Sequence, residues 1–96
     1  MQQTAEAVSE LMKTLGNPKR LLILCQLADG EKSVSDLARD TAMREAAVSQ
    51  QLALLRKDGI VQARREGQSM LYDLAREDVR KIITFLYETY CQPSVC

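Results

Sequence analysis

The sequence predicts a mainly α-helical protein with a β-hairpin wing, in the order ααααββα, which is a winged helix-turn-helix. One observation is a short capped helix starting after Ser33, closely followed by a longer helix that ends at Asp58 and Gly59. Another is a pair of strand-like runs that flank a turn containing Gly67. Because the 96 residues contain no repeat, low-complexity tract or linker, we expect residues 1–96 to form a single domain.

Two helices are expected before this motif. The first covers residues 5–15 and ends at Gly16, and Asn17 with Pro18 then provides a cap and a first-turn proline for the second. The apolar face of the first helix is formed by Val8, Leu11, Met12 and Leu15. That of the second helix is formed by Leu21, Leu24, Cys25 and Ala28.

The helix-turn-helix itself follows from cap and spacing signals. Ser33 can cap the third helix, and Asp36 can reach back to the cap residue in a capping box. The fourth helix has a core stripe at i, i+4 and i+7, consisting of Val48, Leu52 and Leu55. In this arrangement the third helix braces the fourth, whose outer face can then enter the DNA major groove.

The outer face of the fourth helix is small and polar. It carries Ala46, Ser49, Gln50 and Ala53. Small side chains permit a close approach to the duplex, and the Ser and Gln side chains can hydrogen-bond with base edges, Gln most naturally with adenine. Taken alone, this helix is also compatible with an ordinary amphipathic helix that has a solvated polar face.

The predicted hairpin has basic residues near its tip. Arg64, Arg65 and Gln68 could contact phosphates or the minor groove, as the wing of a winged helix does. A solvated hairpin with chance arginines would leave the preceding helix-turn-helix unexplained, so we favour the wing. The candidate DNA contacts are Arg44, Ser49, Gln50, Gln51, Arg64, Arg65 and Gln68.

A last helix is expected over residues 76–90. Its apolar stripe consists of Val79, Ile82, Ile83, Leu86 and Tyr90. Together with the stripe on the first helix, this is more apolar surface than one small core can hide, since a domain of this size buries only about 60–65% of its unfolded surface. We therefore expect a symmetric homodimer, with its two reading helices roughly 34–36 Å apart along the duplex.

Charge and composition limit the kind of partner. The 13 basic and 13 acidic residues cancel, and five basic against four acidic side chains between residues 40 and 68 leave a local charge of +1. DNA binding must therefore depend on where individual arginines point. The four aromatic residues include no Trp, which argues against single-strand stacking and favours double-stranded DNA.

Other classes of function find little support. The longest apolar run, residues 21–25, is too short to cross a membrane, and the N-terminus lacks an export signal, so we expect a cytoplasmic protein with no membrane partner. There is no Cys-x-x-Cys, no His and no phosphate-binding glycine loop. We expect neither an enzyme nor a bound cofactor.

Four segments of the chain carry a resemblance to a known family, namely residues 15–24, 33–37, 48–52 and 55–61. They resemble the ArsR/SmtB family of winged-helix repressors, and the resemblance covers nearly the whole chain. It implies a homodimer joined through the first and last helices, bound to an imperfect palindromic operator and released by an inducer. Family members often have Ser at the positions of Arg44 and Ala46 and His at Gln51, so their base preference is not carried over.

The metal sites of the family do not match this chain. Its arsenic-type site has Cys-x-Cys where this sequence has Ser33 and Ser35, and hydroxyls are poor ligands for soft metals. Its zinc-type site matches at Asp78, but the next positions are Arg80, Cys91 and Ser94. The resemblance therefore implies no metal at either site.

Three cysteines remain, Cys25, Cys91 and Cys96. The placement of Cys25 and Cys91 resembles the persulfide-sensing, BigR/SqrR-like branch of the family. This implies that low-molecular-weight persulfides or polysulfides link the two in an intramolecular polysulfide or disulfide bridge, which releases the operator. Two alternatives remain open. Cys25 can be an inert core residue and Cys91 an incidental thiol, or the protein can be a repressor that responds to a thiophilic metal or metalloid through Cys91 and Cys96.

Overall fold

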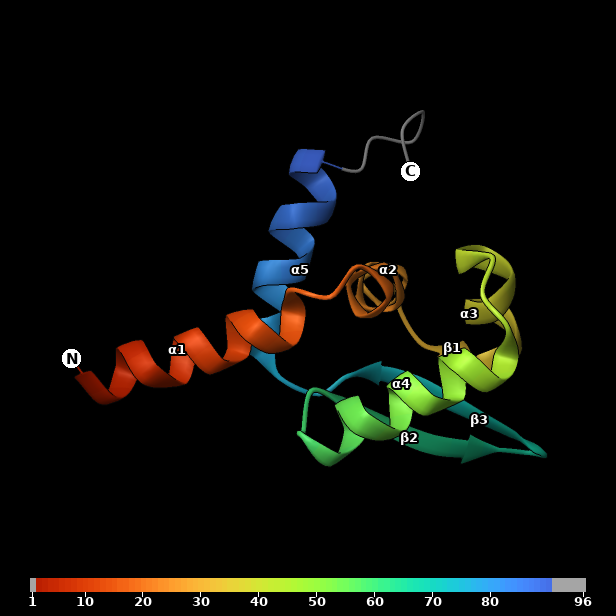
Figure 1. Ribbon diagram of the computed structural model, residues 1–96. Coiled ribbons are helices and arrows are strands. Elements are labelled where there is room, and N and C mark those ends of the chain that lie inside the picture. Colours follow the sequence, from red (N-terminus) through yellow and green to blue (C-terminus); the bar gives the residue numbers. More distant parts are fainter. Residues whose placement is uncertain (1, 91–96) are drawn as a thin grey trace.

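The computed structural model describes residues 2–90 of the chain. Its elements are α1 (Gln2–Leu15), α2 (Pro18–Leu27), β1 (Lys32–Ser33), α3 (Val34–Thr41), α4 (Glu45–Lys57), β2 (Val61–Glu66), β3 (Ser69–Leu74) and α5 (Glu77–Tyr90), shown in Figure 1. The predicted winged helix-turn-helix is confirmed, with all five helices and the hairpin in the expected order. The sequence did not predict β1, which is two residues long.

Helix starts follow the predicted signals closely. The Asn17 side chain accepts hydrogen bonds from the backbone N–H groups of Lys19 (2.9 Å) and Arg20 (3.2 Å), so it caps α2. The Ser33 hydroxyl accepts from the N–H of Asp36 at 3.1 Å and caps α3. The Asp36 carboxylate forms an ion pair with Arg39 at 3.3 Å, a contact one turn further along the same helix. The helix start is therefore stabilised by the cap residue, as expected.

The strands form one antiparallel sheet in the order β1-β3-β2. Its hairpin pairs Glu66 with Ser69, leaving Gly67 and Gln68 as the connecting turn. Gly67 has a φ of 63°, a left-handed conformation that glycine adopts without steric cost. β1 pairs with the edge of β3 that is not paired with β2, and thereby attaches the start of α3 to the wing.

The core lies between the five helices and one face of the sheet. The stripe predicted for α4 is confirmed, because Val48, Leu52 and Leu55 are fully or almost fully buried. They pack with buried side chains of the other elements, including Ile23, Leu24, Leu27, Leu37, Ile60, Leu74, Val79 and Ile83. The reading helix is therefore fixed by its inner face, which leaves its outer face available.

The apolar stripes predicted for α1 and α5 are only partly buried. Leu11 and Leu15 of α1 are buried in the core, whereas Val8 and Met12 are exposed. The prediction that Tyr90 belongs to the apolar stripe of α5 is wrong, since 67% of its surface is exposed. It lies in the last turn of the helix, beyond the side chains that pack against the core.

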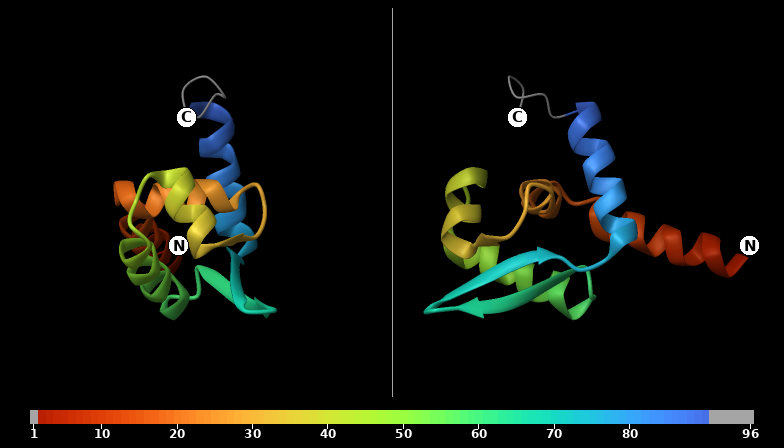
Figure 2. Two further views of the ribbon diagram at one scale, coloured as in Figure 1. Left: turned by 90° about the vertical axis from the view of Figure 1, so that its right-hand side faces the viewer. Right: turned by 180° about the vertical axis from the view of Figure 1, so that it is seen from behind.

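The molecule is elongated and measures 44 × 32 × 20 Å. Figures 1 and 2 show the N-terminal part of α1 at one end and the tip of the β2–β3 hairpin at the other, with the start of α5 beside α1. The longest helices have 14 residues, and within residues 2–90 no helix is long and apolar enough to span a membrane.

Candidate DNA-binding surface and candidate sensing cysteine

The outer face of α4 presents the predicted side chains to solvent. Ala46, Ser49, Gln50 and Ala53 are all exposed. The opposite face of α4 is held by α3 and by β2, against which it packs. A small, polar, rigidly backed helix face is the geometry needed to reach base edges in the major groove.

Gln51 has a different environment from Gln50. It is half-buried, and its side-chain carbonyl oxygen accepts a hydrogen bond from Nε of Arg20 at 2.9 Å. Arg20 lies in the first turn of α2 and also approaches the carbonyl oxygen of Thr14 at 3.5 Å. These bonds connect the reading helix to α2 and to the end of α1. The sequence did not predict a role for Arg20 here, because no local pattern indicates this contact.

The two adjacent wing arginines also differ. Arg64 donates two hydrogen bonds to Glu31, at 2.6 and 2.8 Å, and one to Glu66 at 3.1 Å. Arg65 is exposed and has no ion-pair partner among residues 2–90. Gln68 is exposed in the hairpin turn. The wing therefore carries one available arginine and one that is already engaged.

The distribution of ion pairs explains how a neutral chain can present a basic surface. Several basic side chains have no ion-pair partner in the part of the chain that the structure describes. These are Lys19, Arg20, Arg44, Arg56, Lys57, Arg65 and Lys81. Arg44 is the cap residue of α4, Arg56 and Lys57 lie in its last turn, and Arg65 lies on the wing. Four of these basic side chains thus lie at the reading helix or the hairpin, where Glu45 and Asp58 at the two ends of α4 also have no ion-pair partner among the described residues.

Cys25 lies on α2, which packs against α5. Only 9% of its surface is exposed, and burial raises the pKa of its thiol above the ordinary 9.0. It is therefore protonated at neutral pH and is a weak nucleophile in this conformation. Cys91 and Cys96, the other cysteines considered above, lie outside the described residues; in the sequence, Cys91 directly follows Tyr90 of α5.

This environment predicts how Cys25 reacts. In a protein with Cys91→Ser and Cys96→Ser, we expect iodoacetamide to alkylate Cys25 several-fold more slowly than in the urea-unfolded chain at pH 7. The rate should continue to rise through pH 9, because the fraction of reactive thiolate keeps increasing with pH until the raised pKa is passed. A rate that levels off below pH 8 would contradict this assignment. The measurement is the fraction of alkylated protein as a function of time, determined by mass spectrometry.

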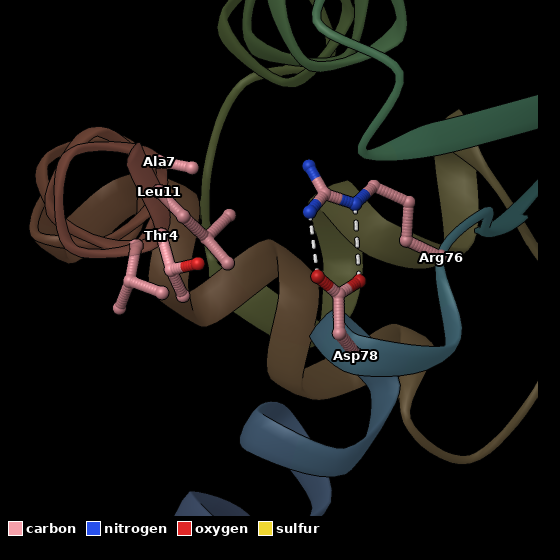
Figure 3. Close-up of a pocket in the computed structure, with 6 residues that line it drawn as sticks. Thr4, Ala7, Leu11, Arg76 and Asp78 are labelled. Carbon is pink, nitrogen blue, oxygen red and sulfur yellow. Dashed lines mark hydrogen bonds and ion pairs between the residues drawn. The ribbon is translucent and has the colours of Figure 1, made fainter. Parts of the chain in front are cut away.

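A shallow pocket of about 300 Å³ lies between α1 and the start of α5, lined by Thr4, Ala7, Val8, Leu11, Arg76 and Asp78 (Figure 3). Nε of Arg76 donates to the Asp78 carboxylate at 3.0 Å, and this contact holds the pKa of Asp78 below its usual value. Asp78 is the one residue that matches the zinc-type pattern, and here its carboxylate is bound to Arg76. It has a structural partner at the start of α5.

Comparisons with known proteins agree with this architecture. A family model described as bacterial regulatory protein, arsR family, matches residues 17–63. The chain is 42% identical, over 97% of its length and 80% of the relative's, to the biofilm growth-associated repressor of Agrobacterium fabrum.

Two solved structures are also similar. The transcriptional repressor BigR from Xylella fastidiosa matches with a TM-score of 0.87 and 36% identity, over 95% of this chain and 90% of that one. The homodimeric winged helix-turn-helix DNA-binding domain of Mb0332 from Mycobacterium bovis matches with a TM-score of 0.76 and 35% identity, over 92% and 82% of the two chains.

Proposed function

The chain belongs to the arsR family of bacterial regulatory proteins, and from this we propose that it is a cytoplasmic repressor whose operator complex is broken by sulfur chemistry at Cys25 and Cys91. The family consists of DNA-binding transcriptional regulators, and the chain is accordingly not an enzyme. One observation carries the proposal for DNA binding. The exposed polar face of α4 lies between basic side chains that have no ion-pair partner among the described residues.

We assign different roles to the candidate DNA contacts. Ser49 and Gln50 read base edges from the exposed face of α4. Arg44 and Arg65 bind phosphates, which fix the register of the protein on the duplex. Gln68 extends the wing tip toward the minor groove. The carbonyl oxygen of Gln51 stays on Arg20, which leaves its amide N–H groups for DNA.

This assignment predicts a difference between two glutamines. Gln50→Ala is expected to weaken binding to an operator selected by the wild-type protein by about 1–3 kcal/mol, because a bidentate base contact is lost. Binding to a duplex of unrelated sequence should change little, since phosphate contacts dominate there. Gln62→Ala, which removes an exposed glutamine from β2, is the matched control. Fluorescence anisotropy titrations measure both, and an unchanged operator affinity for Gln50→Ala would remove this face from the readout.

We propose that the operator is an imperfect palindrome bound by a homodimer. Support comes from apolar side chains that are exposed on three helices, Val8 and Met12 on α1, Leu22 on α2 and Phe85 on α5. A similar chain from Mycobacterium bovis is described as homodimeric. Joining two protomers through α1 and α5 would bury the exposed apolar side chains of these two helices and place the two copies of α4 symmetrically.

For the sensing step, we propose that Cys91 reacts first, since the pKa of Cys25 is raised and its thiol is buried. The Cys91 thiolate attacks the sulfane sulfur of a persulfide RSSH and releases RSH, which leaves a persulfide on Cys91. A second RSSH extends it by one sulfur in the same way. The Cys25 thiolate then attacks the inner sulfane sulfur and expels hydrosulfide, giving a trisulfide bridge. The two persulfides are reduced to two RSH and one H₂S, while the two cysteines are oxidised.

A longer bridge would also select the inducer. A disulfide requires Cα atoms within about 7 Å, whereas each additional sulfur extends the reach by roughly 2 Å. A cysteine pair slightly too far apart for a disulfide would respond to persulfides and resist simple oxidation.

Mass spectrometry distinguishes this sensor from a soft-metal sensor. Reduced protein is treated separately with an organic trisulfide, oxidised glutathione, arsenite and zinc. We expect the organic trisulfide to give an internal bridge between Cys25 and Cys91 with added sulfur mass. Arsenite retained on Cys91 and Cys96, with no bridge formed, would favour the repressor that responds to a thiophilic metal or metalloid.

A further inference from the structure

Arg64 on the wing already binds a carboxylate through one edge of its guanidinium group. Nε of Arg64 lies 2.6 Å from Oε2 of Glu31, and Nη2 lies 2.8 Å from Oε1 of the same carboxylate. Both bonds come from one edge of the guanidinium, and Nη2 also reaches Glu66 at 3.1 Å. This two-point geometry is the one in which arginine binds a carboxylate or a phosphate.

Glu31 reaches this position from a distant part of the chain. It lies in the loop between α2 and β1, directly after Gly30, and is 33 residues away from Arg64 in sequence. Gly30 has a φ of 132°, which an L side chain rarely adopts, so the loop is shaped by that glycine. The contact with Arg64 holds the pKa of Glu31 below its ordinary value, which keeps its carboxylate charged at neutral pH.

Arg64 and Arg65 point to opposite faces of β2, because side chains alternate along a strand. Arg64 shares its face with Gln62 and Glu66, and the bond to Glu31 runs across the sheet on that side. Arg65 has no ion-pair partner among the described residues, as noted above. Of the two wing arginines, Arg64 must therefore give up a protein contact before it can bind DNA by the same edge.

We propose that Glu31 sets the DNA affinity of the protein by competing with the phosphate backbone for Arg64. In the free protein Arg64 is held by Glu31, and on DNA it exchanges this carboxylate for a phosphate. The inference rests on the proposed contact between the wing and DNA. It assigns to Glu31, which does not itself bind DNA, the role of a positioning residue that lowers affinity.

The exchange has a consequence for salt dependence. An arginine that binds a phosphate releases about 0.9 counterion from B-DNA. Because Glu31 competes for Arg64, only part of the DNA-bound wild-type population places Arg64 on a phosphate and releases this counterion. Removing the Glu31 charge should therefore raise affinity and steepen the slope of log K against log salt by up to about one.

Glu31→Gln tests this inference, with titrations on a selected operator and on an unrelated mixed-sequence duplex at several salt concentrations. We expect the dissociation constant to fall about two- to fivefold on both duplexes, the range of one well-formed exposed ion pair. Glu6→Gln, which removes one exposed acidic charge from α1, should leave both affinities almost unchanged. Thermal melting of each variant confirms that it is folded.

A double-mutant cycle with Arg64→Ala separates competition from a general charge effect. Competition predicts that Glu31→Gln loses its gain in affinity and its steeper slope when Arg64 is absent. An equal gain with and without Arg64 would show that only the local negative charge matters, and a loss of affinity in Glu31→Gln would show that the contact supports the bound wing. Either result overturns the inference. If wild-type protein bound neither duplex, the proposed function itself would fail.

Discussion

Phe85→Glu is expected to convert the protein to a monomer and to lower its operator affinity by roughly two to four orders of magnitude. Phe85 lies on α5, and 63% of its surface is exposed in the single chain, so the substitution leaves the core of the protomer intact. In a dimer joined through α1 and α5, the same change would bury a charge in an apolar interface. Each half-site would then be bound by a separate protomer, without the gain that comes from linkage.

Sedimentation equilibrium of the reduced protein at micromolar concentration measures the first effect, and operator titration measures the second. Phe85→Leu is the matched control, because it preserves an apolar side chain and should remain dimeric. If the Glu variant is still a dimer that binds the operator like the wild type, the interface does not include this face of α5. A monomeric wild-type protein would contradict the dimer altogether.

Local signals made most of this fold predictable. The apolar spacing of Val48, Leu52 and Leu55 identified the inner face of α4, which also determines its outer face. Asn17 identified the start of α2 because its side chain caps the helix whatever the tertiary context. Gly67 marked the hairpin turn because that turn needs a left-handed residue.

Contacts between distant residues could not be predicted in this way. The bond from Arg20 to Gln51 spans 31 positions of the sequence, and the bond from Arg64 to Glu31 spans 33. β1 was missed because its two residues are too short to show an alternating pattern, and only pairing with β3 makes them a strand. Such features depend on how the elements pack.

The stripes on α1 and α5 show a second limit. The spacing of apolar residues identifies the apolar face of a helix, but it does not show which partner covers each side chain on that face. The structure separates Leu11 and Leu15, which join the protomer core, from Val8 and Met12, which remain exposed. The candidate dimer surface becomes visible only after the core has been assigned.

The second large effect concerns the sensing cysteines. Cys25→Ser and Cys91→Ser are each expected to bind the operator normally when reduced and to lose the response to sulfane sulfur. Cys25 lies on α2, which packs against α5 and whose Arg20 holds Gln51 of α4. A bridge from α2 to the end of α5 would therefore strain the connection between the dimer helices and the reading helix. A coupling free energy of about 1–3 kcal/mol would lower affinity some 5–150-fold.

Two further variants make this result interpretable. Cys25→Ala is tested beside Cys25→Ser, because a buried hydroxyl without a partner destabilises a core in its own right. Cys96→Ser should respond almost like the wild type, since Cys96 is not part of the proposed bridge. A loss of response in Cys96→Ser alone would favour a different cysteine pair or a soft-metal site.

The most direct test of the sensor is an operator titration, by fluorescence anisotropy, of wild-type and Cys91→Ser protein before and after treatment with an organic trisulfide. We predict that the treated wild-type protein loses affinity within the range given above and that reductant restores it. The Cys91→Ser protein should bind equally well before and after treatment. If Cys91→Ser still dissociates from the operator on treatment, the bridge between Cys25 and Cys91 is not the switch.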